Sequence, residues 1–123
     1  MEIDLVGKSV NAPKFLKILE EEYGWFVSYS IMLAQKHFED PSTRKIYVGL
    51  VFIGDYHWDI HTIRFEEVMY KKDKTERREA VIPPGAIAER AFKELHSAYD
   101  RARELPPEIE ERLKRAQGDN KLV

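Results

Sequence analysis

The chain has 123 residues, the commonest size of a single domain, and 43% of them are hydrophobic, a fraction too high for a disordered chain. Lys and Arg number 20 against 22 Asp and Glu, so the net charge of -2 excludes a strongly basic whole-domain nucleic-acid binder. The chain has no Cys, which excludes disulfides, thiolate metal sites and Cys nucleophiles.

No apolar run approaches the roughly 20 residues that a membrane span requires. Residues 1–9 mix acidic and apolar side chains and lack the basic and apolar regions of a signal peptide. We therefore expect a cytoplasmic protein that does not bind membranes. Balanced charge with few Asn and Gln and no Cys is typical of thermophile proteins, and we expect a thermophile source.

The first predicted element is a helix. Asn11 is a typical N-cap, Pro13 suits the first turn, and Gly24 suits a left-handed stop. From Trp25 to Ala34 the apolar residues alternate, which predicts one half-buried strand.

Three more strands are predicted beyond the turn at 39–42. Residues 46–53 are apolar on both faces, as in a covered central strand. Residues 56–70 form a third strand whose apolar parity changes near His61, which indicates a bulge. The charged run 71–79 reads as a hairpin tip, and 80–82 as a short fourth strand that Pro83 ends.

Two helices are predicted after the sheet. Apolar residues recur at helical spacing over 87–102, and a last helix runs from Pro107 to Gly118. Short connections make the sheet antiparallel. The sequence thus predicts a single α+β domain over 1–118, with a disordered tail at 119–123. Its four-stranded meander has the N-terminal helix and both C-terminal helices packed on one face.

One chemical cluster stands out at the start of the third predicted strand. Asp55, His57, Asp59 and His61 alternate, so their side chains would project from one face. Such ligands suit zinc, manganese or iron, and His57, Asp59 and His61 would make a small metal-dependent hydrolase. The alternative is an ordinary polar strand face. No HExxH pattern completes a metal site, so neither a metal nor another cofactor is favoured.

Aromatic residues concentrate in the predicted sheet. An aromatic sheet face flanked by cations would stack the bases of a single-stranded nucleic acid and follow its phosphates. The residues expected to stack are Trp25, Tyr29, Tyr47 and Trp58, and those expected to contact phosphates are Lys36, Arg44, Lys45, Arg64, Lys71 and Lys72. The alternative is that most of these rings fill the core. Strand register allows only some of them to share a face.

The charged run at 71–79 has two interpretations. It holds five cations, which would make a basic arm for phosphates, but three interspersed acids equally favour a solvated turn that protects a sheet edge. The apolar surface of the C-terminal helices and of the second sheet face predicts a homodimer. The alternative is that this surface packs only within one chain.

Phosphate-loop, dinucleotide-binding and hydrolase motifs are absent from the sequence. The layout resembles that of the archaeal ThermoDBP-type single-stranded DNA-binding proteins in architecture, with no shared motif. The leading hypothesis is a non-enzymatic module that binds single-stranded DNA or RNA. The metal-dependent hydrolase and a protein-interaction subunit are the alternatives.

Overall fold

A computed structural model describes residues 4–54, 58–105, 107–108, 111–112 and 114–115. Its elements are α1 (Ala12–Tyr23), β1 (Phe26–Ser28), β2 (Leu33–Glu39), β3 (Ile46–Phe52), β4 (Thr62–Tyr70), β5 (Thr75–Arg78) and α2 (Gly85–Ala102). The strands form one antiparallel sheet in the order β1-β2-β3-β4-β5, which confirms the predicted α+β meander. In the described residues, no helix is long and apolar enough to cross a membrane.

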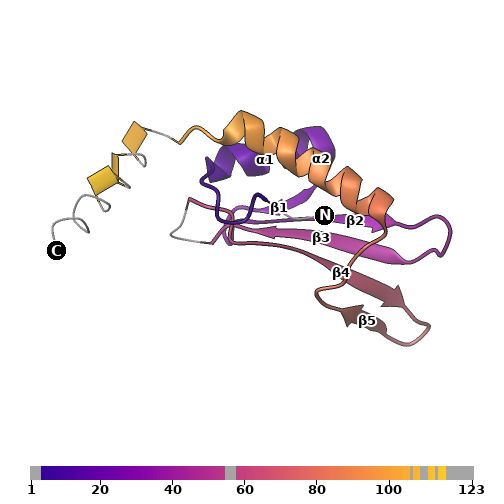
Figure 1. The fold of residues 1–123 in the computed structure, drawn as a ribbon. Coiled ribbons are helices and arrows are strands. Elements are labelled where there is room, and N and C mark those ends of the chain that lie inside the picture. The colour runs from indigo at the N-terminus through magenta and orange to yellow at the C-terminus, as the bar shows by residue number, and fades with distance from the viewer. Residues whose placement is uncertain (1–3, 55–57, 106, 109–110, 113, 116–123) are drawn as a thin grey trace.

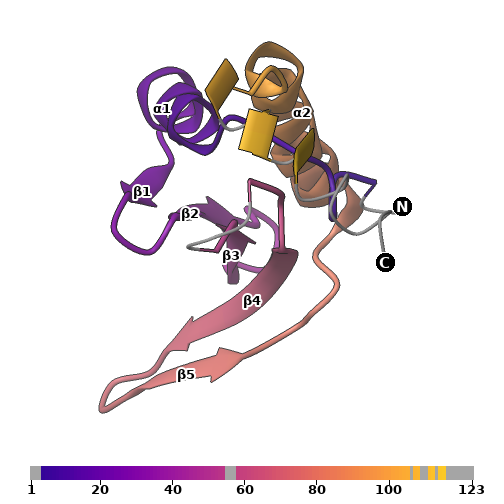
Figure 2. The same ribbon diagram turned by 90° about the vertical axis from the view of Figure 1, so that its left-hand side faces the viewer.

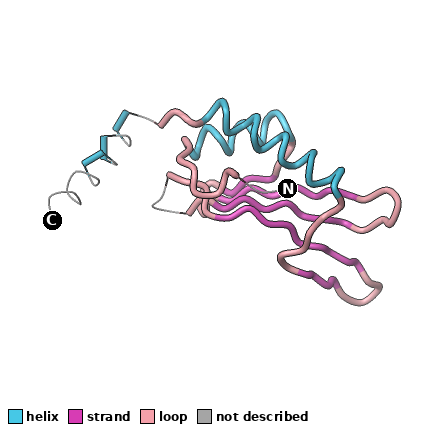
Figure 3. The backbone as a smooth tube through the Cα atoms, viewed as in Figure 1, coloured by secondary structure: helices cyan, strands magenta, loops and turns pink. Residues whose placement is uncertain are grey.

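The elements form two layers (Figures 1 and 2). Both α1 and α2 lie on one face of the sheet, and no helix of the described chain covers the other face. We call the uncovered side the open face. The turns β2–β3 and β4–β5 lie together at one end of the sheet (Figure 3). Both of these arrangements decide which side chains a ligand can reach.

Helix α1 has the predicted ends. The Asn11 side chain accepts a hydrogen bond from the Lys14 amide at 3.3 Å. Gly24 takes a left-handed φ of 73°, and the Trp25 amide donates to the Leu19 carbonyl at 3.0 Å. A side chain at position 24 would be strained in this conformation, which is why glycine ends the helix.

The sheet has five strands, so the prediction of four was wrong. The strand expected from Trp25 to Ala34 is two strands, β1 and β2, joined by a turn at 29–32. Met32 has a φ of 52°, and the hydroxyls of Ser28 and Ser30 lie 3.2 Å apart. The alternating apolar residues therefore continue through a turn. The polar contacts that stabilise such a turn cannot be recognised from the apolar alternation.

The last strand is also displaced from its predicted place. Residues 75–78 of the charged run form β5, and only the four residues 71–74 turn the chain. The Lys71 amide closes this turn by donating a hydrogen bond to the Lys74 carbonyl at 2.9 Å. Ala80, with a φ of 55°, ends the pairing, and Val81 keeps one bond to Phe65 at 3.0 Å. An edge strand has little contact with the core, so charged residues suit it.

The third strand, expected over 56–70, begins later than predicted, because β4 starts at Thr62 and the bulge expected near His61 stays a prediction. The His61 amide donates to the Phe52 carbonyl at 2.9 Å, and the next residue, Thr62, is paired with Phe52. Before β4 the chain pairs with the N-terminal segment, where Asp59 forms a bridge with Ser9. Residues 55–57, where the strand was expected to begin, lie outside the described residues.

Helix α2 matches the long helix that was predicted. The described residues contain two continuous helices rather than three. The expected last helix, 107–118, falls largely outside the described residues, and those of its residues that are described are exposed instead of packed on the sheet. The expected tail at 119–123 also lies outside them.

The core lies between the helices and the covered face of the sheet. Its members from the two layers include Phe15, Leu16, Leu19, Leu95, Trp25, Phe38, Tyr47, Val51, Ile63 and Phe65. Gly49 lies among these rings, where an added Cβ would be 3.3 Å from Trp25 and 3.4 Å from Phe65. The missing side chain of Gly49 leaves the space that the rings occupy.

Candidate nucleic-acid interface

Strand register assigns each sheet side chain to a face. Ala34, Val51 and Ile63 are paired neighbours on the covered face, and Gln35, Leu50 and Arg64 form a row on the open face. Phe26 extends this second row onto β1. The expected stacking and phosphate-binding residues divide between the two faces.

Two of the expected stacking residues are in the core. Trp25 is 2% exposed and Tyr47 is 8% exposed, and both belong to the cluster under the helices. Trp25 packs edge-on against Phe38, with ring centroids 6.1 Å apart. Neither ring is accessible to a base, so the core-filling alternative holds for both. The indole Nε1 of Trp25 is a buried donor without a partner among the described residues.

The other two expected stacking residues lie outside the strands. Trp58 packs partly buried against the core, and its carbonyl accepts from the Val10 amide at 2.8 Å. Tyr29 is exposed in the β1–β2 turn, and its hydroxyl donates to Glu20 at 3.4 Å. Partial desolvation, followed by the charge of Glu20, raises the pKa of Tyr29. The four rings therefore do not share a surface.

Lys36 is committed to an internal ion pair. It projects from the covered face of β2 toward α2, and its Nζ donates to the Glu94 carboxylate at 2.5 Å and to the Tyr23 carbonyl at 2.6 Å. The side chains of Lys36 and Glu94 are 15% and 9% exposed. All three of its donors have acceptors, so this lysine is not available to a phosphate.

Two consecutive buried carboxylates on β4 were missed by the sequence analysis. Glu66 faces the open side, 3.2 Å from Arg64 and 3.5 Å from Arg77. Glu67 faces the other side and pairs with Lys45 at 3.3 Å. Two consecutive Glu residues in the middle of a mostly apolar strand were the available signal, because buried carboxylates need nearby cations.

Three of the expected phosphate-binding residues come together with an aromatic ring. Arg44 and Lys45, from the β2–β3 turn, and Tyr70 and Lys71, from the end of β4, line a hollow of about 290 Å³. We call it the hairpin-end hollow. Tyr70 is 62% exposed, so its ring is accessible. Tyr70 is an accessible ring that the sequence analysis did not select.

The charges around this hollow are unevenly paired. Lys45 pairs with Glu67 at 3.3 Å and Lys71 with Glu76 at 3.0 Å. The hydrogen bond from Lys71 is the main reason that the pKa of Glu76 is lowered. Arg44 and the exposed tip residue Lys72 have no carboxylate partner among the described residues. Their charges remain available to an anion.

The expected metal cluster is only partly described. Asp59 lies in the bridge to Ser9, and His61 bonds Thr62 through Nδ1 at 2.8 Å and packs edge-on against Phe52. Asp55 and His57 lie outside the described residues. Among residues that the structure does describe, no group of three His, Asp or Glu side chains is placed to hold an ion.

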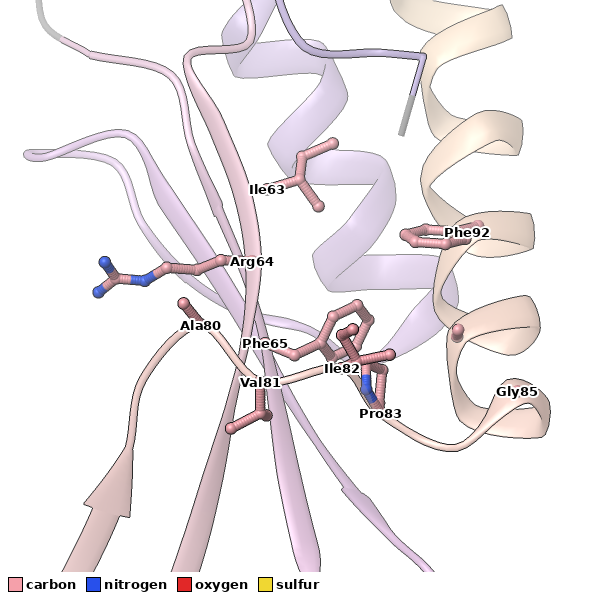
Figure 4. A pocket seen from close by; sticks show the side chains of 10 residues that line it. Ile63, Arg64, Phe65, Ala80, Val81, Ile82, Pro83, Gly85 and Phe92 are labelled. Atoms are coloured by element: carbon pink, nitrogen blue, oxygen red, sulfur yellow. The ribbon is translucent and has the colours of Figure 1, made fainter. Parts of the chain in front are cut away.

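A second hollow lies between β4 and the start of α2 (Figure 4). Its volume is about 520 Å³, and Ile63, Phe65 and Phe92 contribute apolar side chains to it. Arg64 lies at its rim and points away from Phe92. The lining therefore presents no cluster of acid, base or nucleophile inside the hollow.

No family model, no curated protein and no solved structure matches the chain. Its function is therefore inferred from its own geometry.

Proposed function

We propose that this protein is a non-enzymatic module that binds single-stranded nucleic acid at the hairpin-end hollow. The observation that carries the proposal is the exposed ring of Tyr70 beside the cations Arg44, Lys45 and Lys71. An accessible ring stacks on a base of any sequence, while neighbouring cations contact the phosphates on either side. This local site is compatible with a net charge of -2, which whole-surface attraction to nucleic acid is not.

A single strand suits the hollow better than a duplex. Stacking on Tyr70 requires an unpaired base with a free face, which a duplex provides only at its ends. The unpaired cations Arg44 and Lys72 come from the β2–β3 and β4–β5 turns, which lie at the same end of the sheet (Figure 1). Both turns thus offer a cation to the phosphates of a strand whose base stacks on Tyr70.

Fluorescence anisotropy with labelled single-stranded DNA, single-stranded RNA and duplex DNA tests the proposal. We expect Tyr70→Ala to weaken single-strand binding by about 5- to 100-fold, which corresponds to the roughly 1 to 3 kcal/mol of one stacked base. Arg44→Ala with Lys72→Ala should reduce the dependence of affinity on salt, because fewer counterions are released.

The matched control is Phe26→Ala. Phe26 is 66% exposed on the same open face, but it lies on β1, at the opposite edge of the sheet. This variant should bind like the wild type. Absence of binding even at low salt, or an equal loss in Phe26→Ala and Tyr70→Ala, would contradict a site at the hairpin-end hollow.

We also propose that the protein forms a homodimer. The support is the open face, which no helix of the described chain covers (Figure 2) and which presents half-buried apolar side chains on its central strand. Sheets of this kind commonly pack against a second layer. A constant monomer mass across the concentration range would contradict the dimer without affecting the nucleic-acid proposal.

A further inference from the structure

The side chains of β3 form an apolar stripe along the middle of the open face. Its members are Ile46, Val48, Leu50 and Phe52, which alternate with the covered-face residues of the same strand. Val48 is already buried by its neighbours, and the other three are half-buried. Leu50 and Phe52 also line a groove of about 210 Å³ with Leu33, Thr62 and Arg64. The stripe is thus apolar surface that the described fold leaves without a second layer.

The two strands that flank this stripe carry complementary polar groups. In one row of the register, Val48 lies between His37 on β2 and Glu66 on β4. In the next row, Leu50 lies between Gln35 and Arg64. Each of these two rows therefore has an apolar centre, with a polar group on one side and a hydrogen-bonding partner for that group on the other.

We infer that a second copy packs on the open face about a two-fold axis parallel to β3. A half-turn about that axis places the stripe of one subunit on the same stripe of the other and exchanges the flanks. His37 then faces Glu66 of the partner subunit, and Gln35 faces Arg64 of the partner subunit. An isologous interface requires this kind of self-complementary pattern.

The charge pattern favours a second copy over an unrelated occupant. Along the stripe a nucleic acid would meet the carboxylates of Glu66 and Glu39, a cation, Arg64, that is already paired with Glu66, and one half-buried ring, Phe52, which is a poor surface for stacking. Face-to-face sheets pack about 10 Å apart with interdigitated side chains, which fits a stripe of branched residues. The inference rests on the homodimer proposed above and adds its interface and axis.

Sedimentation equilibrium over a range of protein concentrations tests the interface. The wild type should reach the dimer mass, and Leu50→Glu should lower it toward the monomer because a carboxylate would be buried in the stripe. His37→Glu should raise the dimer dissociation constant at least about tenfold, because the new carboxylate would face the carboxylate of Glu66 of the partner subunit. His37→Lys should keep the dimer, because its cation would face the same carboxylate. His37 is exposed, so both substitutions leave the fold of the subunit intact.

Ile82→Glu is the control, because Ile82 is 94% exposed and lies outside the sheet. It should leave the dimer unchanged. A wild type that stays monomeric would overturn the homodimer itself. A wild-type dimer that Leu50→Glu and both His37 variants leave unchanged would overturn this interface and keep the homodimer. Equal weakening by His37→Glu and His37→Lys would overturn the axis.

Discussion

At the residue scale, the ion pair between Lys36 and Glu94 shows how the fold reassigns a charged side chain. Lys36 lies on the covered face because side chains alternate along β2, which places it between the buried residues Ala34 and Phe38. The Nζ of Lys36 lies 2.5 Å from the Glu94 carboxylate, so this ion pair joins β2 to α2. A buried ion pair contributes little net stability, but the loss of one partner leaves the other charge desolvated.

We predict that Glu94→Leu lowers the free energy of unfolding by about 3 kcal/mol, because Lys36 would lose its counter-ion in a buried site. The double variant Lys36→Met with Glu94→Leu should recover most of this loss. Urea denaturation measures both. Glu22→Ala is the control, because Glu22 pairs with Arg101 at 2.6 Å on the exposed surface. Glu22→Ala should lower the free energy of unfolding by less than about 1 kcal/mol. A double variant as unstable as the single one would contradict the explanation.

At the element scale, local signals in the sequence identify the two helices reliably. The caps of α1 bond residues that are near in the sequence, Asn11 with Lys14 and Gly24 with Leu19, so neighbouring residues determine where the helix begins and ends. The strands β1 and β5 differ, because their positions depend on partners elsewhere in the sheet. Residues in β5 are mostly charged and resemble a loop until pairing with β4 is known.

The end of α1 provides a test at this scale. We predict that Gly24→Ala lowers the free energy of unfolding by about 1 to 2 kcal/mol, because its φ of 73° is unfavourable for a residue with a Cβ. Thermal and urea denaturation measure the effect. No atom lies within 4 Å of an added Cβ, so a steric clash does not contribute. An unchanged stability would mean that the helix end rearranges at little cost.

At the scale of the whole molecule, the sheet has a stable centre and weakly held edges. Strands β3 and β4 are paired on both sides and contribute much of the buried core, whereas β1 and β5 are short edge strands with mostly exposed or half-buried side chains. Local opening costs least where few apolar contacts must be broken. The hairpin-end hollow includes Tyr70 and Lys71, which lie next to β5.

Hydrogen exchange tests this distribution of stability. We predict that the amides of β5 exchange several orders of magnitude faster than those of β3, because β5 opens without unfolding the core. Mass spectrometry with peptides that separate 75–78 from 46–52 measures both. Equal protection of the two strands would contradict the weak edge. Slower exchange of β5 with bound single-stranded DNA would be consistent with a ligand at the hairpin-end hollow.

The sequence by itself determined the features that depend on near neighbours: the caps of α1, the extent of α2 and the antiparallel α+β class. It identified the cations that meet at the hairpin end, Arg44, Lys45 and Lys71, without the ring beside them.

Only the tertiary structure decided which aromatic rings face solvent. Trp25 and Tyr47 entered the core and Tyr70 remained exposed, because strand register and the position of both helices on one face fix the direction of each side chain. Those two properties arise from pairing and packing between residues far apart in the chain.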